Sequence, residues 1–286
     1  MNYRHAYHAG GFADVVKHAV LARVIMHLRQ KPAAFRVLDT HAGAGLYDLT
    51  SAEAQKTREA DSGIGALMAA LSRDDFFAPA RELLAPYLDA LAGFNAGGEI
   101  TTYPGSPALA AALLRPVDRL LACETEPTAL AALAASLARD RRAKALNVDG
   151  WTALSAYLPP KERRGVVLID PPFEERNEFP RLAAALGSAH RKWPSGIYLA
   201  WYPLKDAKAV NAFAKRMSGA GIPGVLRAEV ALASRPAADR LGGTGLLLIN
   251  PPWRLDDELR VLLPALAKVF APAQGVARID WLAGEK

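Results

Sequence analysis

An aspartate followed by two prolines and an aromatic residue stands directly after a continuous apolar run. The run is Gly165–Ile169, and the four residues after it are Asp170–Phe173. An amine on an aromatic base is a poor nucleophile because its lone pair is delocalised into the ring, so a site that alkylates it must accept hydrogen bonds from both amine protons. The Asp170 carboxylate and the Pro171 carbonyl are two suitable acceptors, and Phe173 offers a flat face to a base flipped out of its helix. The alternative is a plain loop that ends a strand.

A glycine-rich turn forms a second candidate site, after a short strand expected at 35–38. Gly43 and Gly45 have no Cβ, which lets the backbone pass close to a ligand. A dinucleotide fingerprint needs a third glycine, but Asp48 stands three residues after Gly45, and no second strand carries an acidic residue at the usual spacing of about 20 residues. These departures argue against a nicotinamide dinucleotide, and the turn alone is also compatible with a purely structural role.

Acidic residues follow two more of the expected strands. Glu124 comes after the strand at 119–123, where its carboxylate could accept hydrogen bonds from both hydroxyls of an adenosine ribose. Asp149, which precedes Gly150, could accept a hydrogen bond from an adenine amine. Each alone is typical of a helix cap or a turn. Together with Asp39, which opens the glycine-rich turn, however, they place three acidic residues at three successive strand ends around one crevice.

Strands and helices alternate along most of the chain, and this pattern predicts an α/β fold with a doubly wound parallel sheet in a single domain, 1–286. The apolar residues Val16, Val20 and Val24 recur every fourth position and predict an amphipathic helix at 13–28. Residues 47–104 interrupt the alternation with Ala- and Leu-rich helical patterns, which predict an inserted helical subdomain. The other strands are expected at 143–148, 165–169, 197–201, 225–233 and 246–249, and the other helices at 127–138, 151–157, 181–191, 206–217 and 257–270.

Composition sets the class of protein. The chain has 286 residues, of which 51% are hydrophobic, so it can bury a large core without disulfides or metal. Its single cysteine, Cys123, excludes an internal disulfide. No apolar stretch is long enough to span a bilayer, and no signal peptide is recognised. These three features predict a cytoplasmic protein without a membrane partner. The formal charge of +6 is compatible with nucleic acid binding but does not establish it. No metal site is expected, because no carboxylate or thiolate completes a set with His5, His8 and His18.

Taken together, these motifs resemble those of the ribosomal RNA large subunit methyltransferase J family, and the resemblance runs over nearly the whole chain. The N-terminal segment and the Tyr-Pro-Gly-Ser-Pro segment are specific to the family, whereas the Asp-Pro-Pro motif is widely shared. The matching segments are 3–10, 14–18, 38–45, 103–107, 168–172, 201–203 and 250–253. One departure is Phe173, which stands where the family often has tyrosine; stacking is retained, but a hydroxyl contact is lost.

The resemblance implies a class I S-adenosylmethionine-dependent methyltransferase with a Rossmann-like, seven-stranded sheet and an inserted helical subdomain. It implies methylation of the N6 amine of one adenine in 23S rRNA, by a monomer with no obligate protein partner. Asp170 would also act as the proton acceptor. The residues implied to bind S-adenosylmethionine are Lys17, His41, Ser106, Glu124, Asp149, Gly150 and Asp170, and those expected to contact RNA are Tyr3, Pro171 and Phe173.

A second Pro-Pro motif, Asn250–Trp253, competes with Asp170–Phe173 for the catalytic role. In the methyltransferase version of this sheet the last strand is inserted antiparallel to the others, so its carboxyl end emerges at the rim opposite the cofactor. Asn250 follows that late strand and is therefore expected to be structural.

Other functions remain open on the residues alone. An amino-methyltransferase acting on guanine N2 of small-subunit rRNA or on adenine N6 of DNA would need the same Asp170–Phe173 motif, and only the family-specific segments argue against it. A nucleotide-binding oxidoreductase lacks support because the third glycine is missing. A non-catalytic RNA-binding protein on a methyltransferase scaffold would have no need of an intact Asp-Pro-Pro-Phe motif.

Overall fold

A computed structural model of the protein describes residues 5–73, 76–175, 177–232 and 241–284. Ten strands form an eight-stranded sheet, in the order β10-β8-β9-β7-β6-β1-β4-β5, and a separate pair, β2-β3. The strands are β1 (Arg36–Asp39), β2 (Leu46–Asp48), β3 (Thr102–Pro104), β4 (Arg119–Cys123), β5 (Ala143–Leu146), β6 (Gly165–Ile169), β7 (Ile197–Pro203), β8 (Val225–Ala231), β9 (Gly243–Ile249) and β10 (Val276–Ala283). The helices are α1 (Phe12–Arg29), α2 (Ala52–Thr57), α3 (Ala66–Leu71), α4 (Ala78–Gly93), α5 (Ser106–Leu113), α6 (Pro127–Leu137), α7 (Gly150–Ala156), α8 (Glu178–Lys192), α9 (Ala207–Ser218) and α10 (Leu255–Phe270), with short turns η1 (His5–Tyr7) and η2 (Asp61–Gly65).

The direction of the strands fixes the two rims of the sheet. Strands β5, β4, β1, β6 and β7 pair in parallel, whereas β9 runs antiparallel between β7 and β8. The carboxyl ends of the parallel strands therefore share one rim, and the carboxyl end of β9 lies at the other. This confirms the expected class I methyltransferase sheet and its antiparallel insertion. The seven expected strands are present in the order β5-β4-β1-β6-β7-β9-β8, and β10 adds an eighth, antiparallel to β8 at the sheet edge.

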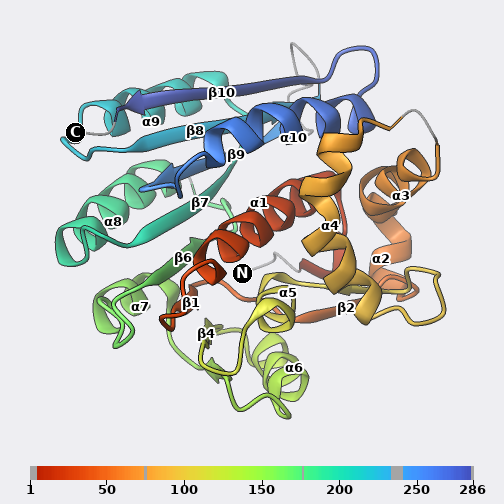
Figure 1. Ribbon diagram of the computed structural model, residues 1–286, viewed down its shortest axis with the longest axis horizontal. Coiled ribbons are helices and arrows are strands. Elements are labelled where there is room, and N and C mark those ends of the chain that lie inside the picture. Colours follow the sequence, from red (N-terminus) through yellow and green to blue (C-terminus); the bar gives the residue numbers. More distant parts are fainter. Residues whose placement is uncertain (1–4, 74–75, 176, 233–240, 285–286) are drawn as a thin grey trace.

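Helices cover both faces of the sheet (Figure 1). Alternate residues of the central strands point to opposite faces, so Val166 and Leu168 of β6 join the apolar cluster beneath α1, α5 and α10, whereas Val167 and Ile169 join the cluster beneath α7, α8 and α9. β6 is buried at every position, as expected for a strand covered on both sides.

The first helix is more deeply buried than its sequence pattern indicated. The spacing of its valines predicted one apolar face, but most of the α1 residues are buried, including three polar ones, Asp14, Lys17 and His18. The reason is that α1 packs against α4, α5 and α10 as well as against the sheet. Buried charged groups need partners, and those of Asp14 and Lys17 lie at the candidate site described below.

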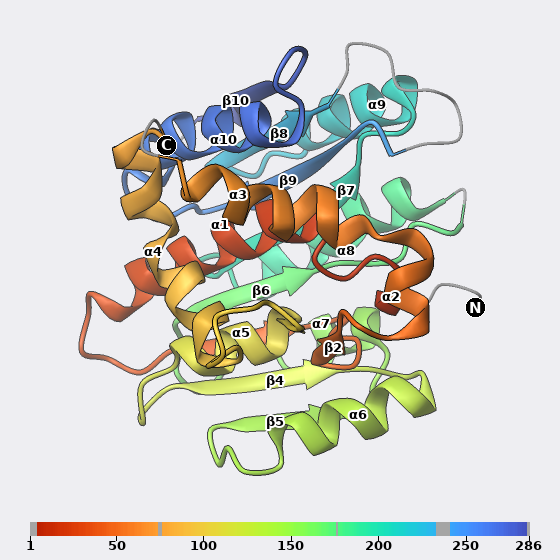
Figure 2. The same ribbon diagram turned by 90° about the vertical axis from the view of Figure 1, so that its right-hand side faces the viewer.

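The stretch between β1 and α5 contains short elements that the sequence pattern did not reveal. β2 and β3 pair antiparallel, with Tyr47 opposite Tyr103, and so bring the two ends of the stretch together. Between them lie α2, η2, α3 and α4, and Figure 2 shows α3 and α4 running over the same side of the molecule as α1. The division into one domain with an inserted helical subdomain at 47–104 stays a prediction. In the part of the chain that the structure describes, no helix has both the length and the apolar character needed to cross a membrane.

The inserted strand β9 provides a test of the packing. A Cβ added at Gly245 would lie 2.3 Å from the ring of Tyr202 on β7, and that ring is held because its hydroxyl donates to Glu229 on β8 at 2.7 Å. We expect Gly245→Ala to lower the free energy of unfolding by about 1–3 kcal/mol, as measured by urea denaturation. Gly93→Ala is the matched control, since nothing lies within 4 Å of its added Cβ, and alanine favours the helix. Equal effects of the two substitutions would show that the Tyr202 ring can move aside.

Candidate active site

Four parallel strands deliver polar side chains to one rim of the sheet. The residues follow β1, β4, β5 and β6, which are neighbours in the order β6-β1-β4-β5. They are His41, Glu124, Asp149 and Asp170. Residues far apart in the chain thus meet because parallel strands end together, which is the usual position of a ligand site in an open α/β sheet.

Glu124 holds the glycine-rich turn. Its Oε2 accepts a hydrogen bond from the backbone N–H of Gly43 at 2.9 Å, and its Oε1 accepts from the N–H groups of Thr125 and Glu126. Gly43 has φ of 63°, and a Cβ there would lie 2.2 Å from the Tyr47 hydroxyl. The turn therefore requires glycine. A carboxylate has about four acceptor positions, so Glu124 retains capacity for a ligand.

Asp149 and Gly150 join the turn from the next strand end. Asp149 caps α7, with its Oδ1 accepting from the backbone N–H and the hydroxyl of Thr152 at 2.9 and 3.1 Å. Gly150 allows α7 to approach the β1 turn, because a Cβ there would lie 2.2 Å from the Thr40 carbonyl oxygen and 2.8 Å from the His41 ring. Asp149 is thus a helix cap whose Oδ2 is not used by the cap.

His41 is a neutral ring at this rim. Burial lowers its pKa to about 4, although the nearby carboxylates of Asp170 and Asp149 act in the opposite direction. Its Nδ1 lies 2.8 Å from the Thr40 hydroxyl, and its ring meets Trp151 edge-on at 5.3 Å between centroids. At neutral pH the ring therefore carries no charge and can act as a hydrogen-bonding or stacking surface.

Asp170 is held by a buried lysine. The Nζ of Lys17 lies 2.5 Å from Asp170 Oδ2 and 2.9 Å from Asp14 Oδ1, and the lysine side chain is 5% exposed. Burial alone would lower the pKa of Lys17, but the two carboxylates outweigh it and raise that pKa above its ordinary value. Lys17 is therefore charged and fixes one Asp170 oxygen. The Asp170 side chain is 14% exposed, and its other oxygen, Oδ1, makes no bond to Lys17.

Asp14 connects this pair to the N-terminal segment. Its Oδ2 accepts from the backbone N–H of Gly10 at 3.1 Å and lies 3.0 Å from His5 Nε2. Burial acts to raise the pKa of Asp14, but His5 and Lys17 hold it well below its usual range. The carboxylate is thus ionised and ties residues 5–10 to the catalytic rim.

Aromatic side chains lie beside Asp170. Phe173 adopts φ of 52°, which is unusual for a residue other than glycine, and its backbone N–H donates to Glu178 at 3.3 Å. Its ring meets Phe179 and Trp201 edge-on, with centroids 4.9 and 5.6 Å apart. Phe173 and Trp201 are partly exposed, so they border the rim with flat apolar surfaces.

Ser106 lies beneath the rim rather than on it. It is the first residue of α5, 5% exposed, and its hydroxyl donates to Asp39 Oδ2 at 2.6 Å. Asp39 is fully buried at the end of β1, and its Oδ1 has no hydrogen-bond partner among the described residues. Burial raises the pKa of Asp39 to about 7, although the bond from Ser106 lowers it.

The structure brings most of the predicted residues together. His41, Glu124, Asp149, Gly150 and Asp170 share the rim, Pro171 and Phe173 continue from Asp170, Lys17 contacts it from α1, and Ser106 supports the turn. Tyr3 lies outside the described residues. Sequence reasoning assigned no role to Asp14 or Trp201. Asp14 stands three residues before Lys17, and that helical spacing was the one available signal for the pair.

The histidines named in the sequence pair with other groups. His5 contacts Asp14, His8 Nδ1 lies 2.8 Å from Glu59, and His18 Nδ1 lies 3.0 Å from the Tyr103 hydroxyl. Within the described ranges, no group of three or more metal-ligating side chains is arranged to hold a metal ion.

Comparisons with known proteins give consistent results. A family model described as "Ribosomal RNA large subunit methyltransferase D, RlmJ" matches residues 32–283. The chain is 37% identical over 288 residues to the ribosomal RNA large subunit methyltransferase J of Escherichia coli, with all of both chains covered. It is 37% identical over 289 residues to the protein of the same name from Haemophilus influenzae, again over full length. A crystal structure of a Legionella pneumophila protein matches with a TM-score of 0.87 and 32% identity, over 98% of this chain and 99% of that one.

The raised pKa of Asp39 predicts a pH dependence of stability. Between its ordinary value of 3.8 and about 7, the unfolded chain releases this proton while the folded chain retains it, so ionisation favours unfolding and stability is lost as pH rises through this range. Asp39→Asn keeps an acceptor for Ser106 but does not titrate. We expect the free energy of unfolding of the wild type to fall relative to that of the variant between pH 4 and pH 7. Urea denaturation at several pH values measures this. His18 and His41 are present in both proteins, so their effects on the pH dependence cancel in the comparison. Parallel plots of the free energy of unfolding against pH for the wild type and Asp39→Asn would contradict the prediction.

Proposed function

This chain belongs to the ribosomal RNA large subunit methyltransferase J family, and we propose that it methylates the N6 amine of an adenine in 23S rRNA with S-adenosylmethionine as the methyl donor. The observation that carries the proposal is the Asp170 carboxylate, held by Lys17 at the end of a fully buried strand with its Oδ1 outside that bond. We further propose that the protein acts as a monomer in the cytoplasm.

The rim fits S-adenosylmethionine in its chemistry. The cofactor presents two ribose hydroxyls and positively charged groups, and the rim presents Glu124 and Asp149, each with acceptor capacity left, beside the glycine turn. Asp39 Oδ1, next to that turn, has no partner among the described residues and can exchange a hydrogen bond with a polar group of the ligand. We propose that Lys17, His41, Ser106, Glu124, Asp149, Gly150 and Asp170 form the cofactor site, Ser106 acting through Asp39. When bound, the cofactor supplies a methyl group activated on a sulfonium.

Asp170 and Pro171 orient the amine. A hydrogen bond from each amine proton, one to Asp170 Oδ1 and one to the Pro171 carbonyl, turns the nitrogen lone pair out of the ring. Lys17 fixes the other oxygen of Asp170, so the free oxygen has a defined position. When nitrogen gains the methyl group it becomes a strong acid, so a carboxylate in an ion pair is basic enough to take its proton. The proton then passes from Asp170 to solvent.

Phe173 and Trp201 supply the flat surfaces that an extruded base needs. Both rings are partly exposed beside Asp170, and their edge-on contact fixes their relative orientation. We propose that the target adenine stacks on this aromatic surface, and that Tyr3 contacts the RNA as the family resemblance implies. Phe173 lacks a hydroxyl, so stacking rather than a hydrogen bond is its contribution.

The two Pro-Pro motifs allow a sharp test of the catalytic role. We expect Asp170→Ala to lower the rate of methyl transfer to 23S rRNA by roughly 100- to 10,000-fold, because the amine loses its acceptor. The fold should persist, since Asp14 still pairs with Lys17. Asn250→Ala should keep the rate but lower the melting temperature, because Asn250 bonds the carbonyls of Pro194 and Gly196 at the opposite rim.

The same assay decides the substrate. Transfer of a tritiated methyl group to 23S rRNA, 16S rRNA and duplex DNA is followed by mass spectrometry of the nucleosides. N6-methyladenosine formed in 23S rRNA supports the proposal. Preferred labelling of 16S rRNA, of DNA or of guanine would overturn the target, and full activity of Asp170→Ala would overturn the catalytic assignment.

A second test concerns the cofactor. Glu124→Gln replaces one acceptor oxygen by a donor and should weaken binding of S-adenosylmethionine by about 1–3 kcal/mol, since a ribose hydroxyl loses its partner. Isothermal titration calorimetry measures this. Glu126→Gln, which removes the same charge two residues away, is the control and should bind like the wild type. If the wild type, Glu124→Gln and Glu126→Gln all bound S-adenosylmethionine with equal affinity, the ribose would not lie at Glu124.

A further inference from the structure

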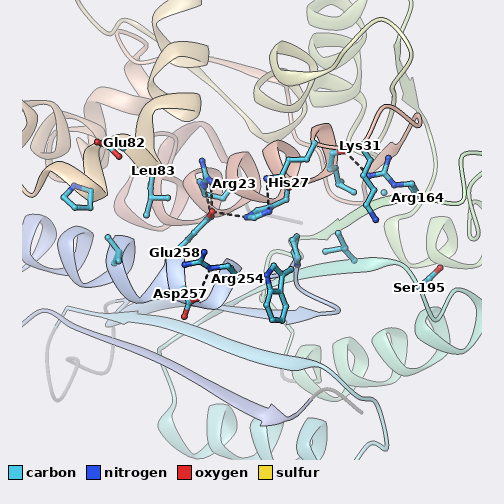
Figure 3. Close-up of a pocket in the computed structure, with 18 of the residues that line it drawn as sticks. Arg23, His27, Lys31, Glu82, Leu83, Arg164, Ser195, Arg254, Asp257 and Glu258 are labelled. Atoms are coloured by element: carbon cyan, nitrogen blue, oxygen red, sulfur yellow. Dashed lines mark hydrogen bonds and ion pairs between the residues drawn. The ribbon is translucent and has the colours of Figure 1, made fainter.

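A cleft of about 1100 Å³ lies at the end of the sheet opposite Asp170. Gly165 and Ile197, the first residues of β6 and β7, line it, so it opens at the amino ends of the parallel strands. Its other walls come from the second half of α1, the first turns of α4 and α10, and the turn after β9. Figure 3 shows charged side chains from α1, α4 and α10 converging on this cleft.

The turn after β9 is built to present a tryptophan. The Asn250 side chain donates to the carbonyls of Pro194 and Gly196 at 2.7 and 2.8 Å, which fixes the turn to the loop before β7. Asn250 and Arg254 adopt positive φ values of 52° and 63° at its two ends. Between them Trp253 is 80% exposed, more than any other large hydrophobic side chain among the described residues. A turn fixed in this way holds the indole in water as a flat face on which a base can stack.

The cations of the cleft are only partly neutralised. Arg23 binds Glu258 through two hydrogen bonds of 2.8 Å, and His27 lies 3.1 Å from the same carboxylate, so both oxygens of Glu258 already have partners (Figure 3). The pair Arg254–Asp257 is exposed on both sides, at 3.4 Å, and pairs of this kind exchange readily with other anions.

A surplus of positive charge remains at the β6 end. The Arg164 guanidinium donates to the carbonyls of Leu28 and Ala33 and forms no ion pair with a described residue. Lys31 and Arg163 are exposed and likewise make no ion pair with the described part of the chain. Exposed cations beside an exposed indole match the repeating chemistry of a single nucleic acid strand, phosphate and flat base.

We propose that this cleft is a second RNA-binding site, which takes an unpaired segment of the rRNA substrate with a base on Trp253 and phosphates at Lys31 and Arg163. That the bound RNA strand belongs to the rRNA substrate rests on the proposed function. The five residues of β6, at about 3.3 Å each, separate the cleft from the catalytic rim by roughly 17 Å. A long RNA can therefore occupy both sites, whereas a short stem around the target adenine occupies only the catalytic one. Occupancy of the cleft should raise affinity for long RNA without changing the chemical step.

Binding is tested first without methylation, using fluorescence anisotropy of a labelled oligouridylate, which contains no adenine. Trp253→Ala should weaken binding by roughly 5- to 100-fold, the equivalent of one lost stack, and Trp253→Phe should recover part of it. Lys31→Gln with Arg163→Gln should flatten the dependence of affinity on salt by about 0.7 per lost phosphate contact. Lys161→Gln removes a nearby charge outside the cleft and should behave like the wild type.

Methylation then separates this proposal from the proposed function. With full-length 23S rRNA, Trp253→Ala should raise KM by a similar factor at unchanged kcat, and with a short hairpin around the target adenine both constants should be unchanged. Unaltered oligouridylate affinity in Trp253→Ala would overturn the second site, even if 23S rRNA is methylated normally. If Trp253→Ala instead changed self-association in analytical ultracentrifugation while RNA affinity stayed the same, the cleft would belong to a second copy of the chain, and the proposal would be wrong.

Discussion

The ammonium of Lys17, buried between the carboxylates of Asp14 and Asp170, is the interaction on which the catalytic rim depends. Removing the Lys17 ammonium would leave two carboxylates without their shared counter-charge, which is strongly destabilising. The constraint fixes three parts of the chain at once: α1 must lie against the end of β6, Asp170 must keep one rotamer, and residues 5–10 must stay near Asp14 through His5 and Gly10. The same contact that orients the Asp170 carboxylate, the proposed proton acceptor, therefore also anchors the N-terminal segment.

The antiparallel β9 gives the two Pro-Pro turns separate positions. Because β9 runs against β7, Asn250 emerges at the rim opposite Asp170, and the two turns cannot share one ligand. Helix α1 connects the rims, with Lys17 at one end and Arg23 and His27 at the other. Because α1 is buried along most of its length, it holds the two rims at a constant distance. An RNA bound at one rim must therefore span that fixed distance to occupy the other.

The sequence predicted what depends on local pattern and strand order. The continuous apolar run before Asp170 identified β6, and the alternation of elements placed Glu124 and Asp149 at the same rim. Contacts between distant residues were not visible: Lys17 and Asp170 are 153 positions apart, and the pair was inferred only as a shared cofactor site. β10 was missed because it is an edge strand of partly buried residues without clear alternation, and β2 and β3 because three residues are too few to show a period.

An enzyme that modifies a base in RNA must bind both a cationic methyl donor and an anionic RNA backbone, and in this chain the charges suited to each lie at different rims. The rim gathers the carboxyl groups of Asp14, Asp39, Glu124, Asp149 and Asp170, and one buried lysine contacts two of them, Asp14 and Asp170. Burial, together with the nearby Asp170 carboxylate, raises the pKa of Asp39 to about 7. Such a rim attracts a sulfonium but repels phosphate. A base is neutral, so it can enter the rim once it has been extruded from the helix, while its backbone stays outside. The favourable interactions that offset the cost of extruding the base must then come from stacking on Phe173 and Trp201 and from cations that bind the RNA backbone away from this rim. A basic cleft at the far rim meets that requirement without placing positive charge beside the cofactor.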